Sequence, residues 1–250
     1  MASSSQVRRS RRDQIQAQRL ADARKERRNR ILFVTAGVVV LAVVVAVAIG
    51  GYIRSSTPTG GTIVPPNANS AKNGIYLAPP TNGAQTLDMF VDYNCTACKS
   101  ANLTLSAVMD QAAQQGKVNI IIHPLSFEGA TSRIAAIAAS CADTVGDFTA
   151  YHNQLFISQS SSGFDTDTLR QTIPNTIGMS PTDTTTFQAC FDNQSTGKFV
   201  TDTQTYGGKE KVTSTPTFIL DGKNITTQLY NNNTKTYDPD LFRSLFNLGS

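Results

Sequence analysis

A pair of cysteines at the junction of two predicted elements restricts what this chain can fold into. Residues 86–93 are rich in β-branched and aromatic side chains, which indicates a strand. Residues 95–116 repeat apolar side chains near helical spacing, which predicts a helix with Asn94 as its N-cap. Cys95 then lies in the first helical turn, where unpaired N–H groups and the helix dipole favour a thiolate. Cys98 follows on the same face, so the two sulfurs can open and close a disulfide.

The alternative for such a pair is half of a zinc site. A structural zinc site needs four ligands, which usually come as two close pairs. The chain has no second Cys-x-x-Cys, and its two histidines, His123 and His152, are isolated from each other. We therefore favour a redox pair and expect no metal ion. His123 stands next to Pro124 and is interpreted as a structural residue at the end of a strand.

The positive charge is concentrated in residues 1–30. This segment has ten Arg and Lys residues against three acids, a net of +7, which leaves the rest of the chain at −3 because the total is +4. A mildly acidic soluble part argues against a nucleic-acid-binding surface. The basic segment is instead expected to be a cytoplasmic tail beside a membrane.

An uncharged apolar segment follows the basic one. Residues 31–49 contain no charge, and the run extends to Ile53 before Arg54 appears. That length crosses a bilayer core of about 30 Å. Because cationic residues stay on the cytoplasmic side, the chain is expected to be a single-pass protein of the cell membrane. Its N-terminus would be inside the cell and its C-terminal domain outside.

A cleaved signal peptide is the competing interpretation of this segment. Residues 46–48, Ala-Val-Ala, resemble a cleavage site, but they lie inside the apolar run. The apolar region of a signal peptide is also shorter, about 7–15 residues. We therefore favour an uncleaved transmembrane helix at residues 31–53. Either interpretation exports the domain that follows.

Composition and periodicity divide the exported part into a flexible linker and one folded domain. The linker, residues 54–74, is rich in Ser, Thr, Pro, Gly and Asn, and the domain occupies residues 75–250. A second strand is predicted at residues 118–123, which makes a βαβ unit with the first strand and helix. A helical block at about 128–195 interrupts this α/β pattern, with helices expected at residues 130–145, 147–157, 166–172 and 182–193.

The pattern after the helical block indicates a hairpin and a terminal helix. Residues 217–220 and 223–229 have strand character, and Asp221-Gly222 between them is a two-residue hairpin turn. Asp238 and Pro239 are typical of a helix N-cap and first position, and apolar side chains follow them.

A second motif opens the hairpin, and with it the chain resembles a known family. The motif is Ser214-Thr215-Pro216-Thr217-Phe218. Together with Asp92-Tyr93-Asn94-Cys95-Thr96-Ala97-Cys98 and the helical insertion, it resembles the DsbA-like thiol–disulfide oxidoreductases of the thioredoxin superfamily. The resemblance covers residues 75–248 and implies a thioredoxin-like α/β fold with an inserted helical domain. The membrane-anchored actinobacterial type is similar.

The resemblance also implies roles for four residues. Cys95 would be the exposed nucleophile and Cys98 its buried partner. The Thr215–Pro216 bond would be cis and would pack against Cys95. The Thr215 backbone would then be free to pair with a strand of the substrate.

This chain departs from the family pattern at two places beside the cysteines. The dipeptide between them is Thr96-Ala97, without the histidine that many relatives carry before the second cysteine. An acid six residues before the first cysteine is replaced by Met89. Asp88 should lie on the opposite strand face, and Asp92 is expected to be solvated or capping.

Cys141 and Cys190 form the remaining pair of the four cysteines. Both lie on apolar faces of predicted helices, where two buried free thiols are one interpretation. Outside the cytosol, a structural disulfide between neighbouring helices is favoured. The similar actinobacterial branch also carries an extra bridge of its own.

The expected function is that of an extracytoplasmic dithiol oxidase that forms disulfides in exported proteins. Its partners would be exported cysteine-containing proteins and a membrane redox partner that reoxidises Cys95 and Cys98, with no bound cofactor. Two alternatives stay open: a reductase or isomerase of exported disulfides, and a non-catalytic thioredoxin-fold binding module or chaperone. The intact cysteine and proline motifs argue against the second alternative.

Overall fold

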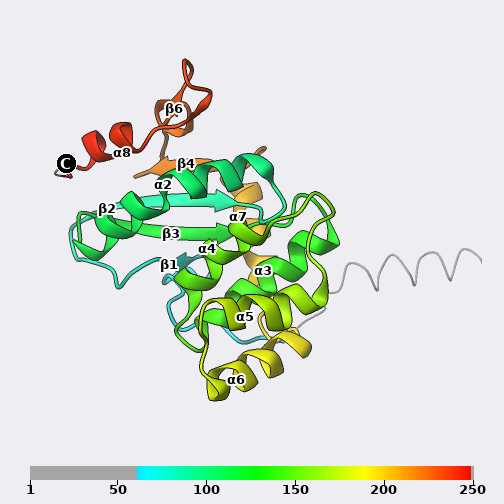
Figure 1. Ribbon diagram of the computed structural model, residues 1–250. Coiled ribbons are helices and arrows are strands. Elements are labelled where there is room, and N and C mark those ends of the chain that lie inside the picture. Colours follow the sequence, from blue (N-terminus) through cyan, green and yellow to red (C-terminus); the bar gives the residue numbers. More distant parts are fainter. Residues whose placement is uncertain (1–60, 249–250) are drawn as a thin grey trace, which may run out of the picture. The chain divides into compact units, whose positions relative to one another are not determined.

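A computed structural model describes residues 61–248 (Figure 1). Its larger sheet has the strand order β1-β3-β2-β4-β5. The strands of this sheet are β1 (Ile75–Tyr76), β2 (Gln85–Val91), β3 (Val118–Pro124), β4 (Thr217–Leu220) and β5 (Lys223–Asn224). The helices are α2 (Thr96–Gln114), α3 (Ala130–Asp143), α4 (Phe148–Ser158), α5 (Ile173–Thr176), α6 (Pro181–Asp192), α7 (Gly197–Lys209) and α8 (Pro239–Leu245). This α/β fold with additional helices agrees with the expectation from the sequence.

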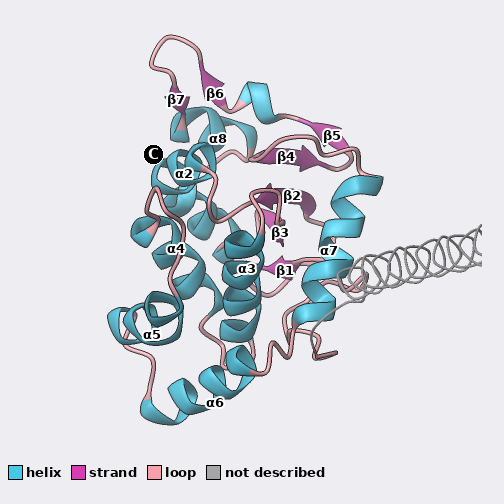
Figure 2. Ribbon diagram, turned by 90° about the vertical axis from the view of Figure 1, so that its right-hand side faces the viewer, coloured by secondary structure: helices cyan, strands magenta, loops and turns pink. Residues whose placement is uncertain are grey.

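Strand β2 lies at the centre of the sheet and carries the first cysteine motif at its end. It pairs in parallel with β3 and antiparallel with β4. Successive side chains of a strand point to opposite faces of the sheet. Leu87, Met89 and Val91 therefore lie in the main hydrophobic core. Phe90 packs on the other face in a second, smaller cluster with Leu125, Val212 and Ile219. Figure 2 shows α2 and α4 on one side of the sheet and α7 on the other.

Helix α7 was not predicted, and its sequence explains why. It contains three threonines and three glycines, and few apolar residues. Gly207 packs closely there, since a Cβ at this position would lie 3.0 Å from Cδ2 of Leu125. The contact brings α7 against the second cluster, where Tyr206 packs on Phe90. Tertiary packing therefore stabilises a helix whose local propensity is poor.

The predicted helical block corresponds to α3 through α6, with one irregular part. Between α4 and α5, residues Thr168–Thr172 form a π-helical turn, η1. The block packs on the sheet domain through large buried side chains, which include Tyr151, Phe156 and Phe187. These belong to the same core as β2 and α2.

Residues 61–74 pack on the domain, although the sequence assigned them to a linker. The Gly61 N–H donates to the carbonyl of Gln194 at 2.9 Å. Asn67 donates its backbone N–H and its side-chain amide to the carboxylate of Asp143, at 2.8 and 2.9 Å. Ala68 forms a bridge with Ile75. The folded part therefore begins before the boundary expected near residue 75, because these polar side chains reach partners in the helical block.

No helix within residues 61–248 is long and apolar enough to span a bilayer. The expected basic tail (1–30), the expected transmembrane helix (31–53) and residues 54–60 of the expected linker lie outside the described residues.

The C-terminal hairpin agrees with the prediction at its turn but not in its second strand. Asp221 and Gly222 both have positive φ, 46° and 81°, as a type I′ turn requires. Strand β5 ends at Asn224, and residues Thr226–Gln228 form a 3-10 turn, η2. A small second sheet follows, from β6 (Tyr230–Asn231) and β7 (Thr236–Tyr237). Asp238 caps α8 as predicted, accepting from the N–H of Asp240 at 2.9 Å.

Candidate active site at the start of helix α2

Cys95 is itself the N-cap of α2, so the predicted cap at Asn94 was wrong by one residue. Cys95 has extended backbone angles, φ −72° and ψ 119°, and its carbonyl accepts the N–H of Lys99 at 3.1 Å. The Asn94 side chain points elsewhere and donates to the hydroxyl of Thr131 at 2.6 Å. As N-cap, Cys95 lies beside the N–H groups of the first helical turn, which have no partner within the helix.

The two sequence motifs meet at the Cys95 sulfur. The Thr215–Pro216 peptide bond is cis. The Cys95 thiol donates to the Thr215 carbonyl at 3.2 Å, across 120 residues of sequence. The contact exists because β4, which follows Pro216, pairs antiparallel with β2, which precedes Cys95. The end of one strand and the beginning of the other therefore lie side by side.

The surroundings of the two sulfurs give them opposite acidities. A hydrogen bond with Cys98 lowers the pKa of Cys95 to about 6. Burial opposes this shift, and Thr215 and the backbone N–H groups of Cys98 and Ala97 add to it. Burial raises the pKa of Cys98 well above its ordinary value, and the neighbouring Cys95 raises it further. At pH 7 Cys95 is therefore largely a thiolate, whereas Cys98 is a protonated thiol. Both side chains are buried, Cys95 at 8% exposed and Cys98 at 0%, so the expectation of an exposed Cys95 was wrong.

Asp92 holds the loop that leads into the site. It is fully buried, and its carboxylate accepts the N–H groups of Asn94 at 2.9 Å and Glu128 at 3.0 Å. The expectation that Asp92 is solvated or capping is therefore wrong, because it is buried and its partners are loop N–H groups outside α2, which has no side-chain cap. The Asp92 carboxylate ties the cysteine loop to the loop after β3.

The position that relatives fill with an acid is apolar here. Met89 is fully buried in the main core. The neighbouring Asp88 lies on the opposite face, as the alternation predicts, and binds His123 Nε2 at 2.7 Å. His123 is buried, and its Nδ1 bonds the carbonyl of Asn73 at 2.8 Å. His123 is thus a structural residue of β3 on the face away from the cysteines.

A buried polar network behind the cysteine loop was missed by the sequence analysis. The Tyr93 hydroxyl and His152 Nδ1 are 3.0 Å apart, and His152 Nε2 lies 3.1 Å from Asn102 Oδ1. Because an amide oxygen only accepts, Nε2 carries the proton and Nδ1 accepts from Tyr93. Complete burial lowers the pKa of His152 to about 3, so the imidazole is neutral. The sequence signals only an isolated histidine on a helix.

Gln159 is the second residue that the sequence analysis missed. It follows the last residue of α4, and its side-chain amide donates to the carbonyls of Tyr93 at 2.6 Å and Cys95 at 3.0 Å. A glutamine after a helix carries no sequence signal for such a contact.

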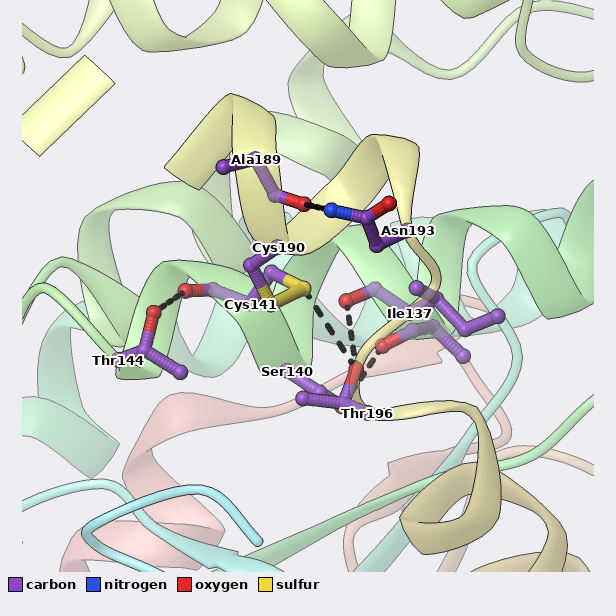
Figure 3. The surroundings of a disulfide bond; sticks show 9 residues. Ile137, Ser140, Cys141, Thr144, Ala189, Cys190, Asn193 and Thr196 are labelled. Carbon is purple, nitrogen blue, oxygen red and sulfur yellow. Dashed lines mark hydrogen bonds between the residues drawn. A yellow bond between two sulfur atoms is a disulfide. The ribbon is translucent and has the colours of Figure 1, made fainter. Parts of the chain in front are cut away.

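Cys141 and Cys190 form a disulfide, as the sequence analysis expected (Figure 3). It joins α3 to α6 with a Cα–Cα distance of 5.7 Å. The Thr196 hydroxyl lies 3.6 Å from the Cys141 sulfur and donates to the carbonyl of Ile137 at 3.3 Å. The bridge belongs to the helical block and not to the pair at α2.

The described residues contain no group of three or more His, Cys, Asp or Glu side chains that could hold a metal ion.

The chain is similar to known proteins in sequence and in fold. A protein-family model described as thioredoxin matches residues 80–237. The MdbA protein of Actinomyces oris, a thiol-disulfide oxidoreductase, superposes with a TM-score of 0.62 at 16% identity, over 74% of this chain and 92% of that one. MdbA of Corynebacterium diphtheriae gives 0.55 at 18% identity, over 66% and 90%. A thioredoxin-like oxidoreductase of Silicibacter pomeroyi gives 0.51 at 24% identity, over 63% and 88%. No curated protein matches the chain in sequence.

Proposed function

This chain belongs to the thioredoxin family, and we propose that it is a thiol–disulfide oxidoreductase that forms disulfides in exported proteins. One observation carries the proposal. The Cys95 sulfur, with its pKa lowered to about 6, lies at the start of α2 against the Thr215 carbonyl, above a buried Cys98. A binding module would not need a thiol of this acidity beside a second, protonated one.

The reaction begins from the oxidised pair. A substrate thiolate attacks the Cys95 sulfur, a mixed disulfide forms, and the Cys95–Cys98 bond breaks. Cys98 leaves with the electron pair and takes up a proton, because burial raises its pKa. A second substrate thiolate then attacks the substrate sulfur of the mixed disulfide. Cys95 leaves as a thiolate, and the low pKa makes it a good leaving group.

The electrons transferred in this reaction require a redox partner. Two electrons pass from two substrate thiols to the Cys95–Cys98 pair, which ends as a thiol and a thiolate. An acceptor must remove those electrons before the next turnover. We assign this role to a membrane redox partner, because the apolar segment at residues 31–53 would hold the domain at the cell membrane. The N-terminus would be cytoplasmic and the cysteine domain outside, where disulfides persist.

The acidity of Cys95 favours the oxidising direction. Lowering a thiol pKa from 9 to about 6 stabilises the reduced form at pH 7. The equilibrium constant for thiol–disulfide exchange shifts roughly tenfold toward the reduced protein, which raises the reduction potential by about 30 mV for a two-electron couple. A stabilised dithiol makes the disulfide a stronger oxidant.

The deciding experiment is the reduction potential of the Cys95–Cys98 pair, measured by equilibration with glutathione buffers. A value near or above about −180 mV supports an oxidase of exported proteins. A value near about −270 mV would replace the proposal with a reductase. The same protein should oxidise a dithiol peptide stoichiometrically, and failure to do so would leave only a binding role.

Location and anchoring have a separate test. A membrane-impermeant maleimide should label Cys95 in intact cells, and the labelled chain should sediment with membranes. A chain that lacks residues 1–53 should be released from the membrane fraction. Labelling that appears only after lysis would place the domain inside the cell and contradict the proposal.

A further inference from the structure

The helical block reaches into the cysteine loop through one side chain, Gln159. We propose that Gln159 is a positioning residue that sets the reactivity of Cys95. Both hydrogens of its amide are engaged, because Nε2 lies 2.6 Å from the carbonyl oxygen of Tyr93 and 3.0 Å from that of Cys95. The inference deepens the proposed function by naming what controls the nucleophile, and its main readout does not require exchange activity.

Gln159 is held in place from both sides. The backbone N–H of Gln159 donates to the carbonyl of Phe156 at 3.4 Å, and Phe156 is fully buried in the core. Its own carbonyl accepts the ammonium of Lys99 at 3.0 Å. Lys99 in turn donates its backbone N–H to the carbonyl of Cys95 at 3.1 Å. A closed ring of hydrogen bonds therefore joins the end of α4 to the first turn of α2.

The amide acts on the sulfur through the backbone. The carbonyl oxygens of Tyr93 and Cys95 belong to the Tyr93–Asn94 and Cys95–Thr96 peptide groups on either side of the nucleophile. The two amide hydrogens offset the partial negative charge of these oxygens, that of Cys95 together with the Lys99 N–H. They also orient the start of the helical turn whose next N–H groups, at Ala97 and Cys98, lower the pKa of Cys95. A merely structural contact would affect stability without affecting the sulfur.

The chain offers a matched control on the same helix. Gln154 is half-buried like Gln159, but its amide donates to the Ser158 hydroxyl at 3.0 Å, within α4. Substitutions at the two positions remove the same chemical group from the same helix. They differ in whether the group reaches the cysteine loop.

The test measures the Cys95 thiolate by its ultraviolet absorbance against pH in the full chain. Q159M keeps the side-chain length and removes both donors. Q159M should raise the Cys95 pKa by less than about one unit, because these bonds reach the backbone and only the difference between the thiol and the thiolate states shifts a pKa. Q159E adds an anion beside the same carbonyls and should raise the pKa further. Q159K restores donors and should bring the pKa back to the wild-type value or below.

The controls Q154M and Q154E should leave the Cys95 pKa unchanged. Unchanged values for both Q159M and Q159E would overturn the proposal, as would equal shifts at the two positions. Thermal unfolding of each variant identifies any that fails to fold. The inference would then be decided by Q159A against Q154A, which are both neutral and remove the same amide from two positions that differ in contact with the cysteine loop.

Failure of this inference can be distinguished from failure of the proposed function. If the thiolate pKa follows the expected order but no variant oxidises a dithiol peptide, the oxidase proposal fails and the role of Gln159 stands. If wild type and Q159M oxidise the peptide with the same pH profile and the same pKa, the oxidase proposal stands and the role of Gln159 fails.

Discussion

A histidine in place of Ala97 is expected to make the protein a stronger oxidant. Ala97 is exposed at the start of α2, so a larger side chain enters solvent and not the core. Its backbone N–H already lowers the pKa of Cys95, which places this residue next to the sulfur. A protonated imidazole there would stabilise the thiolate by charge.

The magnitude follows from the position of the site at the protein surface. A cation about 4–6 Å from a partly solvated sulfur is worth roughly 1–2 kcal/mol, between the limits for water and for a protein surface. About one pKa unit corresponds to 1.36 kcal/mol, so the Cys95 pKa would fall from about 6 to about 5. At pH 7 an imidazole with an ordinary pKa near 6.5 is only partly protonated, so the reduced form is stabilised roughly threefold, which is about 15 mV.

The effect should depend on pH in a direction that the charges determine. Below about pH 4, Cys95 is protonated in both proteins and the difference disappears. Above about pH 8, the imidazole is neutral and the difference shrinks again. The gain in oxidising power is therefore largest near pH 6–7.

The assay is equilibration of wild type and A97H against glutathione buffers at several pH values, with thiolate absorbance measured in parallel. A107H is the control, since Ala107 is also exposed on α2 and lies ten residues, or about 15 Å, along the helix. At physiological ionic strength that separation is beyond the screening length of about 8 Å. An unchanged or more reducing potential in A97H, or an equal shift in A107H, would refute the reasoning.

Three further predictions concern the two cysteine pairs and the buried histidine. C98S should accumulate mixed disulfides with substrate proteins through Cys95, and C95S should accumulate none. Non-reducing electrophoresis detects these adducts, and adducts formed only through Cys98 would reverse the two roles. Replacing both Cys141 and Cys190 with serine should lower the free energy of unfolding by up to about 4 kcal/mol, from closure of a 49-residue separation. The Cys95 pKa should not change, and denaturant melts with thiolate titration check both parts. His152 has its folded pKa lowered to about 3 from 6.5, so its contribution to stability is present above pH 6.5 and is lost as pH falls toward 3. H152Q should lack this loss between pH 6.5 and 3, and equal acid sensitivity of the two proteins would contradict it.

Local sequence patterns predicted several features of the protein correctly. The strand before Cys95 and the helix after it follow from periodicity that near neighbours encode. Asp221-Gly222 predicted its turn because both positions need positive φ, which few residues tolerate. Asp238 predicted a helix start because its short side chain caps N–H groups one turn away.

Patterns of this kind failed where packing competes with local preference. Helix α7 has poor propensity and exists because Gly207 permits close approach to Leu125. The cap moved from Asn94 to Cys95 because Thr131, which lies on another helix, offers the asparagine side chain a partner. In each case a distant contact outweighs a local preference worth about 1 kcal/mol.

The sequence by itself predicted the sulfur atoms on which the proposed chemistry rests, because sulfur at a strand–helix junction has its reactivity set largely by the adjacent backbone. Only the tertiary structure decided what surrounds those atoms. Strand pairing across 120 residues brings the Thr215 carbonyl to the Cys95 sulfur, and the end of α4 brings the Gln159 amide to the same loop. Such contacts depend on how whole elements pack, and packing is a property of the complete core that no short stretch of sequence encodes.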